Sequence, residues 1–479
     1  MSPVEILPAE LLGIVFHLLV GTQSDRNSQT FPHVISHYRS KLRVLISASH
    51  VCKRWRDLVL HDGTLWTYIP IESSRRGCWE TTECFLKRSK RSELDVSVLL
   101  DASHGTSPTA ITVIAALCAQ YARIRSLRLS TDTPVSLFCG PDPATAMGTL
   151  EIFNRSRLYY PVAKFGGTFP SLRSLTLHGF SSWPSDLFSN LTRLRLKSVS
   201  AKNPFKLSRL TNLLRASPEL EAVYLSSYLS VVDDLPPTDV VHLRNLQKML
   251  LRACDSAAIL SHVVIPETSS LDIIMDHRRL QATKPLPPHQ TNIVSSLPSG
   301  LSNMQFSNET TQLILEQDRL RGGFGLGLSF FNSSTSSLVI IDCSRQIEIF
   351  VQRSLDAISS HPYFEIIRSV TLTLSPSIPV DWPRFLGRFK HLVELNTSVC
   401  RGPTILFALA RLHASGTPLC PSLKHIRLFE NPVGCTIFNH RLLQLLSDFR
   451  TTFRCEPIKV TVHDENGHRT RSFVSRPHV

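Results

Sequence analysis

The first part of the chain alternates apolar and polar residues with the period of an α-helix. Between residues 11 and 19, apolar side chains follow one another at intervals of one or three, which places them on one helical face. Pro8 suits the first turn of this helix, where its missing N–H costs nothing, and Gly21 marks a stop. The predicted apolar face consists of Leu11, Leu12, Val15, Phe16 and Leu19.

A second helical stretch begins near Lys41, after a polar segment (residues 21–40) that we interpret as a loop. We expect three short amphipathic helices in all, closed by the Leu-Trp pair at residues 65–66. A module of about sixty residues buries little core alone, which makes it a candidate to complete its core against a partner. In residues 51–59 the predicted apolar side carries Val51, Cys52, Trp55, Leu58 and Val59, and the hydrated side carries Lys53, Arg54 and Arg56.

After residue 66 the pattern changes to a tract resembling Leu-x-x-Leu-x-Leu, which keeps returning. Within each tract the last two apolar residues alternate with polar ones, which is the period of a strand with one buried face. Clear neighbours start 19 to 29 residues apart, the usual spacing of leucine-rich repeats. The tracts begin at Ile124, Leu172, Leu191, Leu220, Leu246, Leu271, Leu338, Ile367, Leu392 and Leu423.

Helical stretches are predicted between these tracts, at residues 207–214, 347–359, 406–413 and 442–449. Strand-then-helix repetition with short links produces parallel strands and right-handed crossovers. Stacking at a short period produces a curved solenoid rather than a closed barrel. We therefore predict an α/β fold, in which a small three-helix module precedes a solenoid with a curved parallel sheet and helices on its convex side.

The predicted array is degenerate. The ninth position of a leucine-rich repeat is usually Asn or Cys. In this chain that position carries Asn or Cys in only three tracts, at Cys254, Cys400 and Asn431. Residues 281–305 contain four prolines, so we expect a loop that protrudes from the array. The Gly-rich residues 322–328 lack the Lys-Ser/Thr of a phosphate loop, and we interpret them as a flexible turn.

Length and composition add three points to this picture. The 479 residues suggest roughly three domains, but the patterns replace them with two unequal parts, residues 1–70 and 71–479. The 42% hydrophobic content excludes wholesale disorder. The 30 Pro outnumber the 20 Gly, which suits a chain of many short elements and argues against Gly-rich phosphate loops.

Several sequence features bear on the compartment. No apolar run approaches the roughly 20 residues of a membrane-spanning helix. Residues 1–5 lack the basic region of a signal peptide. The 11 Cys are spread singly without a C-x-x-C pair, which is typical of reduced thiols. We therefore expect a cytoplasmic or nuclear protein that does not contact a membrane.

The net charge of +14 is compatible with acidic protein partners or nucleic acid. Half of the excess is local, because residues 39–91 contain 12 Lys/Arg against 5 Asp/Glu. No aromatic residues are interleaved with the sharpest cluster, residues 87–91, as single-strand binders require. We therefore interpret this cluster as a solvated face and do not expect nucleic-acid binding.

Motifs for catalysis are absent from the sequence. It contains no H-E-x-x-H, G-x-S-x-G or Walker A pattern. The 19 His are scattered without metal-ligand spacing, and the acidic pair Asp233-Asp234 has no identifiable partners for a Mg²⁺ site. We therefore expect a protein that is not an enzyme and binds neither a cofactor nor a metal.

The helical module resembles an F-box of the type common in mushroom-forming fungi. The resemblance rests on Leu7-Pro8-x-Glu10-Leu11-Leu12-x-x-Val15-Phe16, on Val51-Cys52-Lys53-Arg54-Trp55-Arg56 and on Leu65-Trp66, in this order. Residues 21–40 make the first linker longer than that of a compact F-box. Residues 187–196 and 213–221 look like the leucine-rich repeats that follow F-boxes in those fungal proteins.

This resemblance implies a function without chemistry by the chain itself. The F-box would dock on a Skp-type adaptor and through it on a cullin, while the repeats bind a protein substrate of a ubiquitin ligase and contribute proximity. The basic side of the second stretch would assist association with an acidic adaptor surface. The implied adaptor contacts are Leu7, Pro8, Leu11, Leu12, Val15, Phe16, Val51, Cys52, Arg54, Trp55, Leu58, Leu65 and Trp66.

Two other classes of function are alternatives to this one. A basic leucine-rich-repeat scaffold without a ligase link would bind nucleic acid, with an affinity that falls steeply as salt rises. A hydrolase built on an α/β sheet would need a nucleophile motif, which the sequence lacks.

Overall fold

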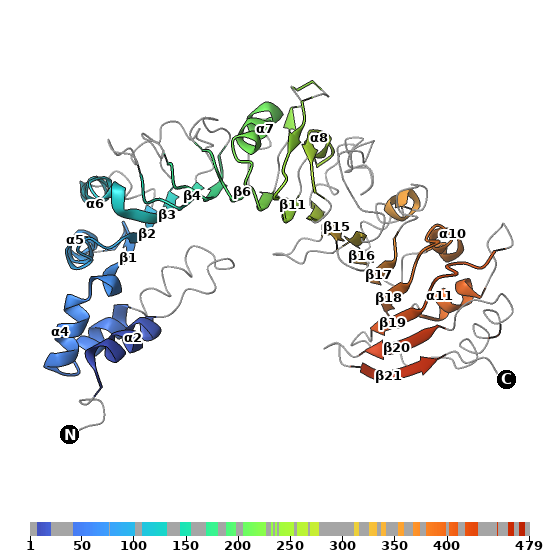
Figure 1. Ribbon diagram of the computed structural model, residues 1–479, viewed down its shortest axis with the longest axis horizontal. Helices are drawn as coiled ribbons and strands as arrows, with labels where there is room; N and C mark the ends of the chain where they lie inside the picture. Colours follow the sequence, from blue (N-terminus) through green and yellow to red (C-terminus); the bar gives the residue numbers. More distant parts are fainter. Residues whose placement is uncertain are drawn as a thin grey trace. The chain divides into compact units, whose positions relative to one another are not determined.

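The structure of the protein is a computed structural model, drawn in Figure 1. Two compact units, Met1–Phe205 and Lys206–Val479, divide the chain, and each is described by itself. The structure describes residues 7–20, 42–75, 77–100, 108–131, 144–154, 169–180, 188–197, 205–226, 231–232, 235–236, 239–252, 256–266, 269–276, 311–315, 325–332, 337–341, 353–358, 367–373, 380–398, 402–410, 417–429, 448, 458–463 and 469–474.

The first unit begins with the predicted helical module. Helix α2 (Ala9–Val20) is followed by a helix over residues 42–49, by α4 (Lys53–His61) and by the 3₁₀-helix η1 (Gly63–Trp66). The loop predicted between α2 and the second helix lies outside the described residues. The three predicted helices are confirmed, but their second stretch is divided by a turn at residues 50–52.

That turn corrects the prediction for Val51 and Cys52. We expected both on the apolar side of one helix, but both precede α4 and are exposed. Cys52 is the N-cap of α4, and its Sγ accepts a hydrogen bond from the backbone N–H of Trp55 at 3.5 Å. The first N–H groups of a helix have no partner within it, and the N-cap side chain accepts a hydrogen bond from one of them. Because Cys52 has this role, its side chain does not lie on the apolar face of α4.

The rest of the first unit is a parallel sheet of six strands, each paired with the next along the chain. Helices α5 (Cys78–Arg88) and α6 (Pro108–Cys118) lie together on one side of its first strands in Figure 1, and η2 (Tyr121–Arg123) leads into the third strand. The strands are β1 (Tyr68–Glu72), β2 (Leu94–Leu100), β3 (Ile124–Thr131), β4 (Thr149–Asn154), β5 (Ser174–His178) and β6 (Arg193–Lys197).

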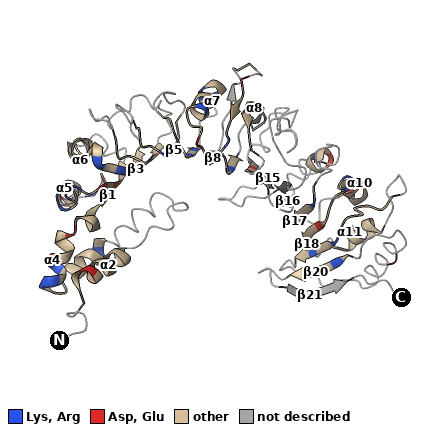
Figure 2. Ribbon diagram, viewed as in Figure 1, with Lys and Arg blue, Asp and Glu red and all other residues tan. Residues whose placement is uncertain are grey.

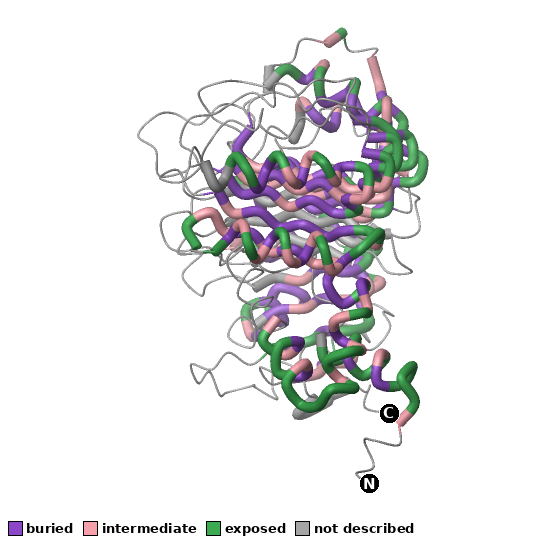
Figure 3. The backbone as a smooth tube through the Cα atoms, turned by 90° about the vertical axis from the view of Figure 1, so that its left-hand side faces the viewer, coloured by how far each residue is buried: buried purple, intermediate pink, exposed green. Residues whose placement is uncertain are grey.

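The core of this sheet consists of apolar rows that run across the strands. Because the strands are parallel and in register, Ile69 of β1 lies in the same row as Leu194 of β6, through the paired residues of the four strands between them. Figure 3 shows buried positions alternating with less buried ones along the strands. Each fully buried aliphatic side chain contributes about 1.5–3 kcal/mol. The row consists of Ile69, Val96, Leu127, Leu150, Leu175 and Leu194, none more than 1% exposed.

The second unit contains a sheet with both parallel and antiparallel pairs. Strands β8, β11 and β13 are parallel, and so are β14 and β16 to β20 in sequence order. Antiparallel pairs join β13 to β15, β15 to β14, and β20 to β21. The strands are β8 (Ala222–Ser226), β11 (Lys248–Arg252), β13 (Ser270–Asp276), β14 (Thr311–Leu315), β15 (Gly325–Asn332), β16 (Ser337–Ile341), β17 (Ser369–Thr373), β18 (Glu394–Ser398), β19 (His425–Phe429), β20 (Lys459–His463) and β21 (Arg469–Val474).

The Gly-rich segment is one point at which the prediction was wrong. Residues 325–328, which we expected in a turn, open strand β15, and residues 322–324 lie outside the described part. This segment alternates Gly with Leu, and the antiparallel partner β13 pairs with its backbone from Gly325 to Phe330. Strand pairing with a long neighbour thus overrides the turn preference of glycine. The predicted protruding loop at residues 281–305 also lies outside the described residues.

Helices of the second unit agree in part with their predictions. Helix α7 (Leu207–Arg215) confirms the prediction for residues 207–214. Residues 353–358 are helical within the predicted 347–359, and α11 (Gly402–Leu409) begins four residues earlier than predicted. Of the helix predicted at 442–449, only residue 448 is described. The remaining elements are α8 (Ser256–Ser261), α10 (Trp382–Leu386), β7 (Phe205–Lys206), β9 (Val231–Val232), β10 (Val241–His242) and β12 (Val263–Val264).

The fold class predicted from the sequence is confirmed. In the first unit an N-terminal helical region precedes a parallel sheet, and the second unit contains a sheet of mainly parallel strands; both are consistent with a repeat solenoid. The three antiparallel pairs of the second unit are the departure from an all-parallel sheet.

Candidate docking surface of the helical module

Helix α2 is apolar around more of its circumference than its own module can bury. Its sequence AELLGIVFHLLV contains two polar side chains, Glu10 and His17. Leu12 and Phe16, one turn apart, are both only 1% exposed and form the inward side. A helix this apolar either lies deep in a core or meets a partner. Five further apolar side chains of α2 are at the surface, which gives it the character of a partner-binding helix: Leu11, Ile14, Val15, Leu18 and Leu19.

The exposed side of α2 is a stripe at spacings of three and one residues. We call Leu11, Ile14, Val15 and Leu18 the exposed face of α2; their exposed fractions are 46%, 54%, 38% and 63%. On a helix these positions lie one above another on a single side. The adjoining Leu19 is also exposed. Of the five residues of the predicted apolar face, two (Leu12 and Phe16) are thus core and three are surface.

Large exposed apolar side chains concentrate in this module. Ile46 of the second helix is 46% exposed and Val51 of the turn is 60% exposed. Seven of the ten large exposed apolar residues in the described part of the chain belong to residues 11–51. Such a concentration marks an interaction site rather than ordinary surface scatter.

Aromatic packing supports the exposed face from beneath. The rings of Phe16 and Trp55 meet edge to face, with centroids 5.1 Å apart. Leu45 of the second helix and Val59 of α4 are also buried. Edge-to-face pairs add about 0.5–1.5 kcal/mol beyond their area burial. Phe16 therefore anchors α2 to α4 and leaves its exposed face outward.

Two arginines of α4 have partners within the module. The guanidinium of Arg54 donates from Nη2 to the backbone carbonyl of Leu7, before α2. Nε of Arg56 donates to the carbonyl of Ser49 at 2.9 Å. Both side chains remain exposed (Figure 2 shows the basic residues of α4), so these bonds orient the cations rather than bury them. Arg54 thus connects the start of α2 to α4.

A polar cluster that the sequence analysis missed closes the end of α4. Asp62 Oδ1 accepts the backbone N–H of Thr64 at 3.0 Å and caps η1. Nε2 of His17 lies 3.3 Å from Asp62 Oδ2 and 3.0 Å from Thr64 Oγ1. One of the two polar residues of α2 therefore fixes the helix against η1. No sequence motif indicates this contact, because its members are 45 and 47 residues apart.

Leu65 and Trp66 of η1 form a buried joint with α5. Both are buried, and the indole N–H of Trp66 donates to the carbonyl of Val59 at 2.7 Å. The Trp66 ring meets Phe85 of α5 edge to face at 5.3 Å, and the Arg88 guanidinium lies 4.3 Å from the ring centroid. A cation over an aromatic face is favourable by roughly 0.5–1 kcal/mol when exposed.

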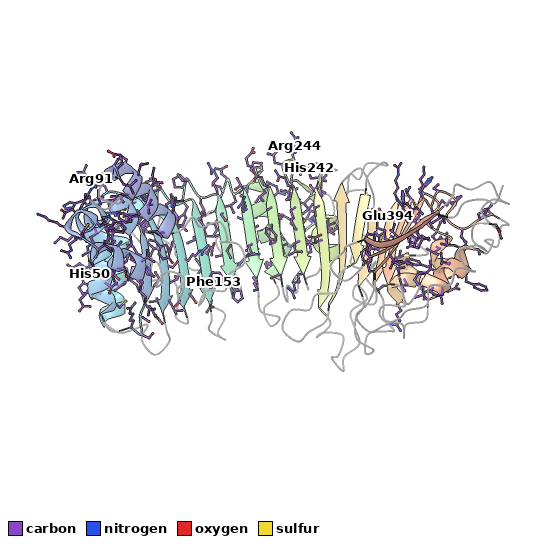
Figure 4. All side chains as sticks on the ribbon, turned by 90° about the horizontal axis from the view of Figure 1, so that it is seen from below. His50, Arg91, Phe153, His242, Arg244 and Glu394 are labelled. Atoms are coloured by element: carbon purple, nitrogen blue, oxygen red, sulfur yellow. The ribbon has the colours of Figure 1, made fainter. Side chains whose placement is uncertain are left out.

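The basic cluster at residues 87–91 contributes to the same joint. Besides Arg88, Lys90 donates from Nζ to the carbonyl of His61 at 2.7 Å. Lys87 and Arg91, the latter labelled in Figure 4, are exposed. The prediction of a solvated face is therefore wrong for Arg88, which is half-buried over Trp66, whereas Lys90 is exposed as predicted and also donates to the helical module.

The predicted adaptor contacts thus divide into three groups. The exposed members, on which a partner could rest directly, are separated from members that fill the core. Ile14, Leu18, Leu19 and Ile46 share the exposure of the first group and were not predicted. Exposed are Pro8, Leu11, Val15, Val51, Cys52 and Arg54; half-buried are Leu7, Trp55 and Leu58; buried are Leu12, Phe16, Leu65 and Trp66.

The described residues offer little else with chemical character. No three His, Cys, Asp or Glu side chains gather among them as a metal would require. Within the same ranges, no helix is long and apolar enough to cross a membrane. The five cysteines that the structure describes are free thiols.

Comparison with known proteins identifies the helical module. The family model described as F-box-like matches residues 4–71, a range that contains α2, α4, η1 and nearly all of β1. Comparison with curated proteins finds no match to the chain. The exposed face of α2 lies inside the matched range. The chain therefore carries an F-box-like domain at residues 4–71.

Proposed function

We propose that this protein is the substrate-recognition subunit of a Skp–cullin–F-box type ubiquitin ligase. F-box domains bind Skp-type adaptors, and through them a cullin, so the matched domain supports an adaptor-docking role. In this proposal residues 1–70 dock and the leucine-rich-repeat array, residues 71–479, binds a protein substrate. The ligase would operate in the cytoplasm or the nucleus, and the chain would contribute proximity and no chemistry of its own.

The observation that carries this proposal is the exposed face of α2 inside the F-box-like domain. Leu11, Ile14, Val15 and Leu18 present apolar side chains that the folded chain leaves in water. Full burial of an aliphatic side chain contributes about 1.5–3 kcal/mol, and each of these half-exposed side chains would contribute roughly half of that. A few of them are enough to supply the core of a stable interface. We propose that these residues contact the adaptor, with Val51 and Arg54 beside them.

The buried members of the predicted set act through these contacts. Leu12, Phe16 and Trp66 hold α2, α4 and η1 in place, and none of them offers surface to a partner. Their substitution would weaken docking by disturbing the fold of the domain. The proposed interface therefore differs from the sequence-based prediction in its membership, and it adds Ile14 and Leu18.

A single charge on the exposed face of α2 tests the proposal. We expect Leu18→Asp to weaken binding of the full chain to a purified Skp-type adaptor at least tenfold, because it places a carboxylate in an apolar contact. The matched control is Ile111→Asp on α6, which is 53% exposed and lies outside the F-box-like domain. Isothermal titration calorimetry measures both affinities, and circular dichroism verifies the folds. Equal affinity of Leu18→Asp and the wild type would contradict the proposal.

A further inference from the structure

Both arginines of strand β3 pair with a carboxylate on a neighbouring strand. Arg125 Nη2 lies 2.6 Å from Asp95 Oδ2 of β2, and Arg128 Nε lies 3.0 Å from Glu151 Oε2 of β4. Opposite charges on adjacent strands stabilise a sheet, and they also neutralise its surface. The region where helix α5 ends does not follow this pattern.

The basic cluster at residues 87–91 is joined by Arg123 of η2, which makes a group of five cations. Nε of Arg123 donates to the carbonyl of Ser92 at 3.1 Å, and Nη2 donates to the hydroxyl of Ser89 at 2.5 Å. Nη1 of Arg123 also donates to the carbonyl of Lys90. Arg123 therefore fastens η2 to the turn that follows α5.

The partners of these cations in the described part of the chain are neutral groups. Arg88 lies over an aromatic ring, Lys90 donates to a backbone carbonyl, and Arg123 donates to carbonyl, hydroxyl and amide oxygens. Lys87 and Arg91 are exposed, and neither forms an ion pair with a described carboxylate. Positive charge thus accumulates here without internal compensation.

The guanidinium of Arg123 shows the effect of this difference. Burial lowers the pKa of Arg123, whereas the pKa of Arg125, two residues along the chain, is raised first by its hydrogen bond to Asp95. A partly buried cation costs free energy unless an opposite charge compensates it. An anion bound at the basic cluster would supply that compensation.

Local structure explains only part of the basic cluster. Lys87 and Arg88 occupy the last turn of α5, where the helix dipole favours cations. Lys90 follows the C-cap residue Ser89 with φ of +52°, a left-handed conformation that glycine adopts at lower cost. Lys90 and Arg91 lie beyond the helix, so its dipole does not account for them. The remaining positive charge suits an acidic partner.

We propose that the basic cluster is a docking site for an acidic segment of a protein partner. Neighbouring Asp or Glu side chains of that segment would meet Lys87 and Arg91 directly. Arg88, Lys90 and Arg123, which the fold holds in place, would add to the attraction. The inference goes beyond the proposed function and does not rest on it, because the cluster lies outside the F-box-like domain at residues 4–71.

The form of the cluster favours an acidic protein segment over nucleic acid. Four of the five cations lie within five consecutive residues, which makes a compact group instead of a row that follows a phosphate backbone. The neighbouring Trp66 ring is 2% exposed and is covered by Arg88, so it offers no surface for base stacking. Lysine and arginine form charge-assisted hydrogen bonds to carboxylates, which suits a short acidic motif.

A synthetic peptide tests this inference on the full chain. The probe is a fluorescein-labelled peptide of four Glu-Glu-Ser repeats, read by fluorescence anisotropy, with four Gln-Gln-Ser repeats as its neutral counterpart. We expect the Glu peptide to bind the wild type and the Gln peptide not to bind. The double variant Lys87→Gln, Arg91→Gln should lose at least fivefold in affinity for the Glu peptide, because it removes the two cations that contact carboxylates directly.

A second double variant controls for net charge. Arg43→Gln, Arg193→Gln removes two exposed cations of the same unit, one from the second helix and one from β6, and should change the affinity less than twofold. Thermal unfolding of the free Lys87→Gln, Arg91→Gln variant at low salt provides a further readout. Its melting temperature should equal or exceed that of the wild type, because the substitutions relieve repulsion and break no ion pair.

Four outcomes would overturn the inference. The first two are absence of binding to the Glu peptide, and equal affinity of the Lys87→Gln, Arg91→Gln variant and the wild type. The third is an equal loss in the control variant, which would make the binding a matter of net charge alone. The fourth is tighter binding of an oligothymidylate of ten nucleotides than of the peptide, which would assign the cluster to nucleic acid instead.

Discussion

Residues of the same type in this protein differ in role according to neighbours that only the fold brings together. Leu11 and Leu12 are adjacent in sequence and equally apolar, yet Leu12 is 1% exposed and Leu11 is 46% exposed. The difference arises because the side of α2 that carries Leu12 and Phe16 faces the inside of the module, where the Phe16 ring meets Trp55 of α4. Helical periodicity predicts that these residues share an arc, but tertiary packing decides which part of the arc is core.

Glycine provides a residue-scale prediction. Gly179, after β5, has φ of +83°, and a Cβ there would lie 2.6 Å from the backbone oxygen of Asn154. The Gly179 N–H donates to the backbone carbonyl of Lys197 at 2.9 Å, and the Gly179 carbonyl accepts from Asn154 Nδ2 at 3.0 Å, so the backbone is held on both sides. We expect Gly179→Ala to destabilise the protein by at least about 2 kcal/mol, through the left-handed backbone and the clash.

The control for this prediction is Gly13→Ala in helix α2. A Cβ at Gly13 meets nothing within 4 Å. Alanine in a helix interior is favoured over glycine by roughly 0.5–1 kcal/mol, so this variant should be slightly more stable than the wild type. Urea unfolding followed by circular dichroism measures both. Equal midpoints for the two variants would refute the account of Gly179.

At the scale of elements, strands with an explicit leucine tract could be predicted, and those without it could not. The tracts at Ile124, Leu172 and Leu191 correspond to β3, β5 and β6. Strands β1, β2 and β4 were missed because their apolar residues alternate without the preceding leucine; β1 even contains Pro70. Their place is fixed by register with neighbours, a long-range property that local pattern does not contain.

The joint between α4 and α5 provides an element-scale prediction. Trp66→Phe keeps a ring beside Phe85 but removes the N–H that satisfies the buried Val59 carbonyl, which should cost about 1–3 kcal/mol. Trp66→Ala should cost more, about 3–5 kcal/mol, because it also leaves a cavity. Arg88→Met, which loses only the cation above the ring, should have the smallest effect.

Thermal or urea unfolding of the full chain provides the measurement for these three variants. The account requires the order Ala, Phe, then Met, from the most to the least destabilised. If Trp66→Phe were as stable as the wild type, the indole hydrogen bond would not hold the two helices together.

At the scale of the whole molecule, the sequence predicts two parts and a fold class, and the structure adds how charge is distributed between them. The net charge of +14 is not spread evenly over the surface. Arg88 and Lys90 serve the joint, several sheet cations neutralise carboxylates, and β6 concentrates three cations on one strand. The residues of the docking face were half predictable: periodicity located α2, but the exposure of Ile14 and Leu18 depends on packing.

The central claim is that the F-box-like domain binds a Skp-type adaptor while the rest of the chain stays free for a substrate. Size-exclusion chromatography with light scattering of the full chain mixed with a purified Skp-type adaptor tests it most directly. The account predicts a one-to-one complex that persists with the control variant Ile111→Asp and is lost with Leu18→Asp. Separate elution of the wild-type chain and the adaptor would contradict it.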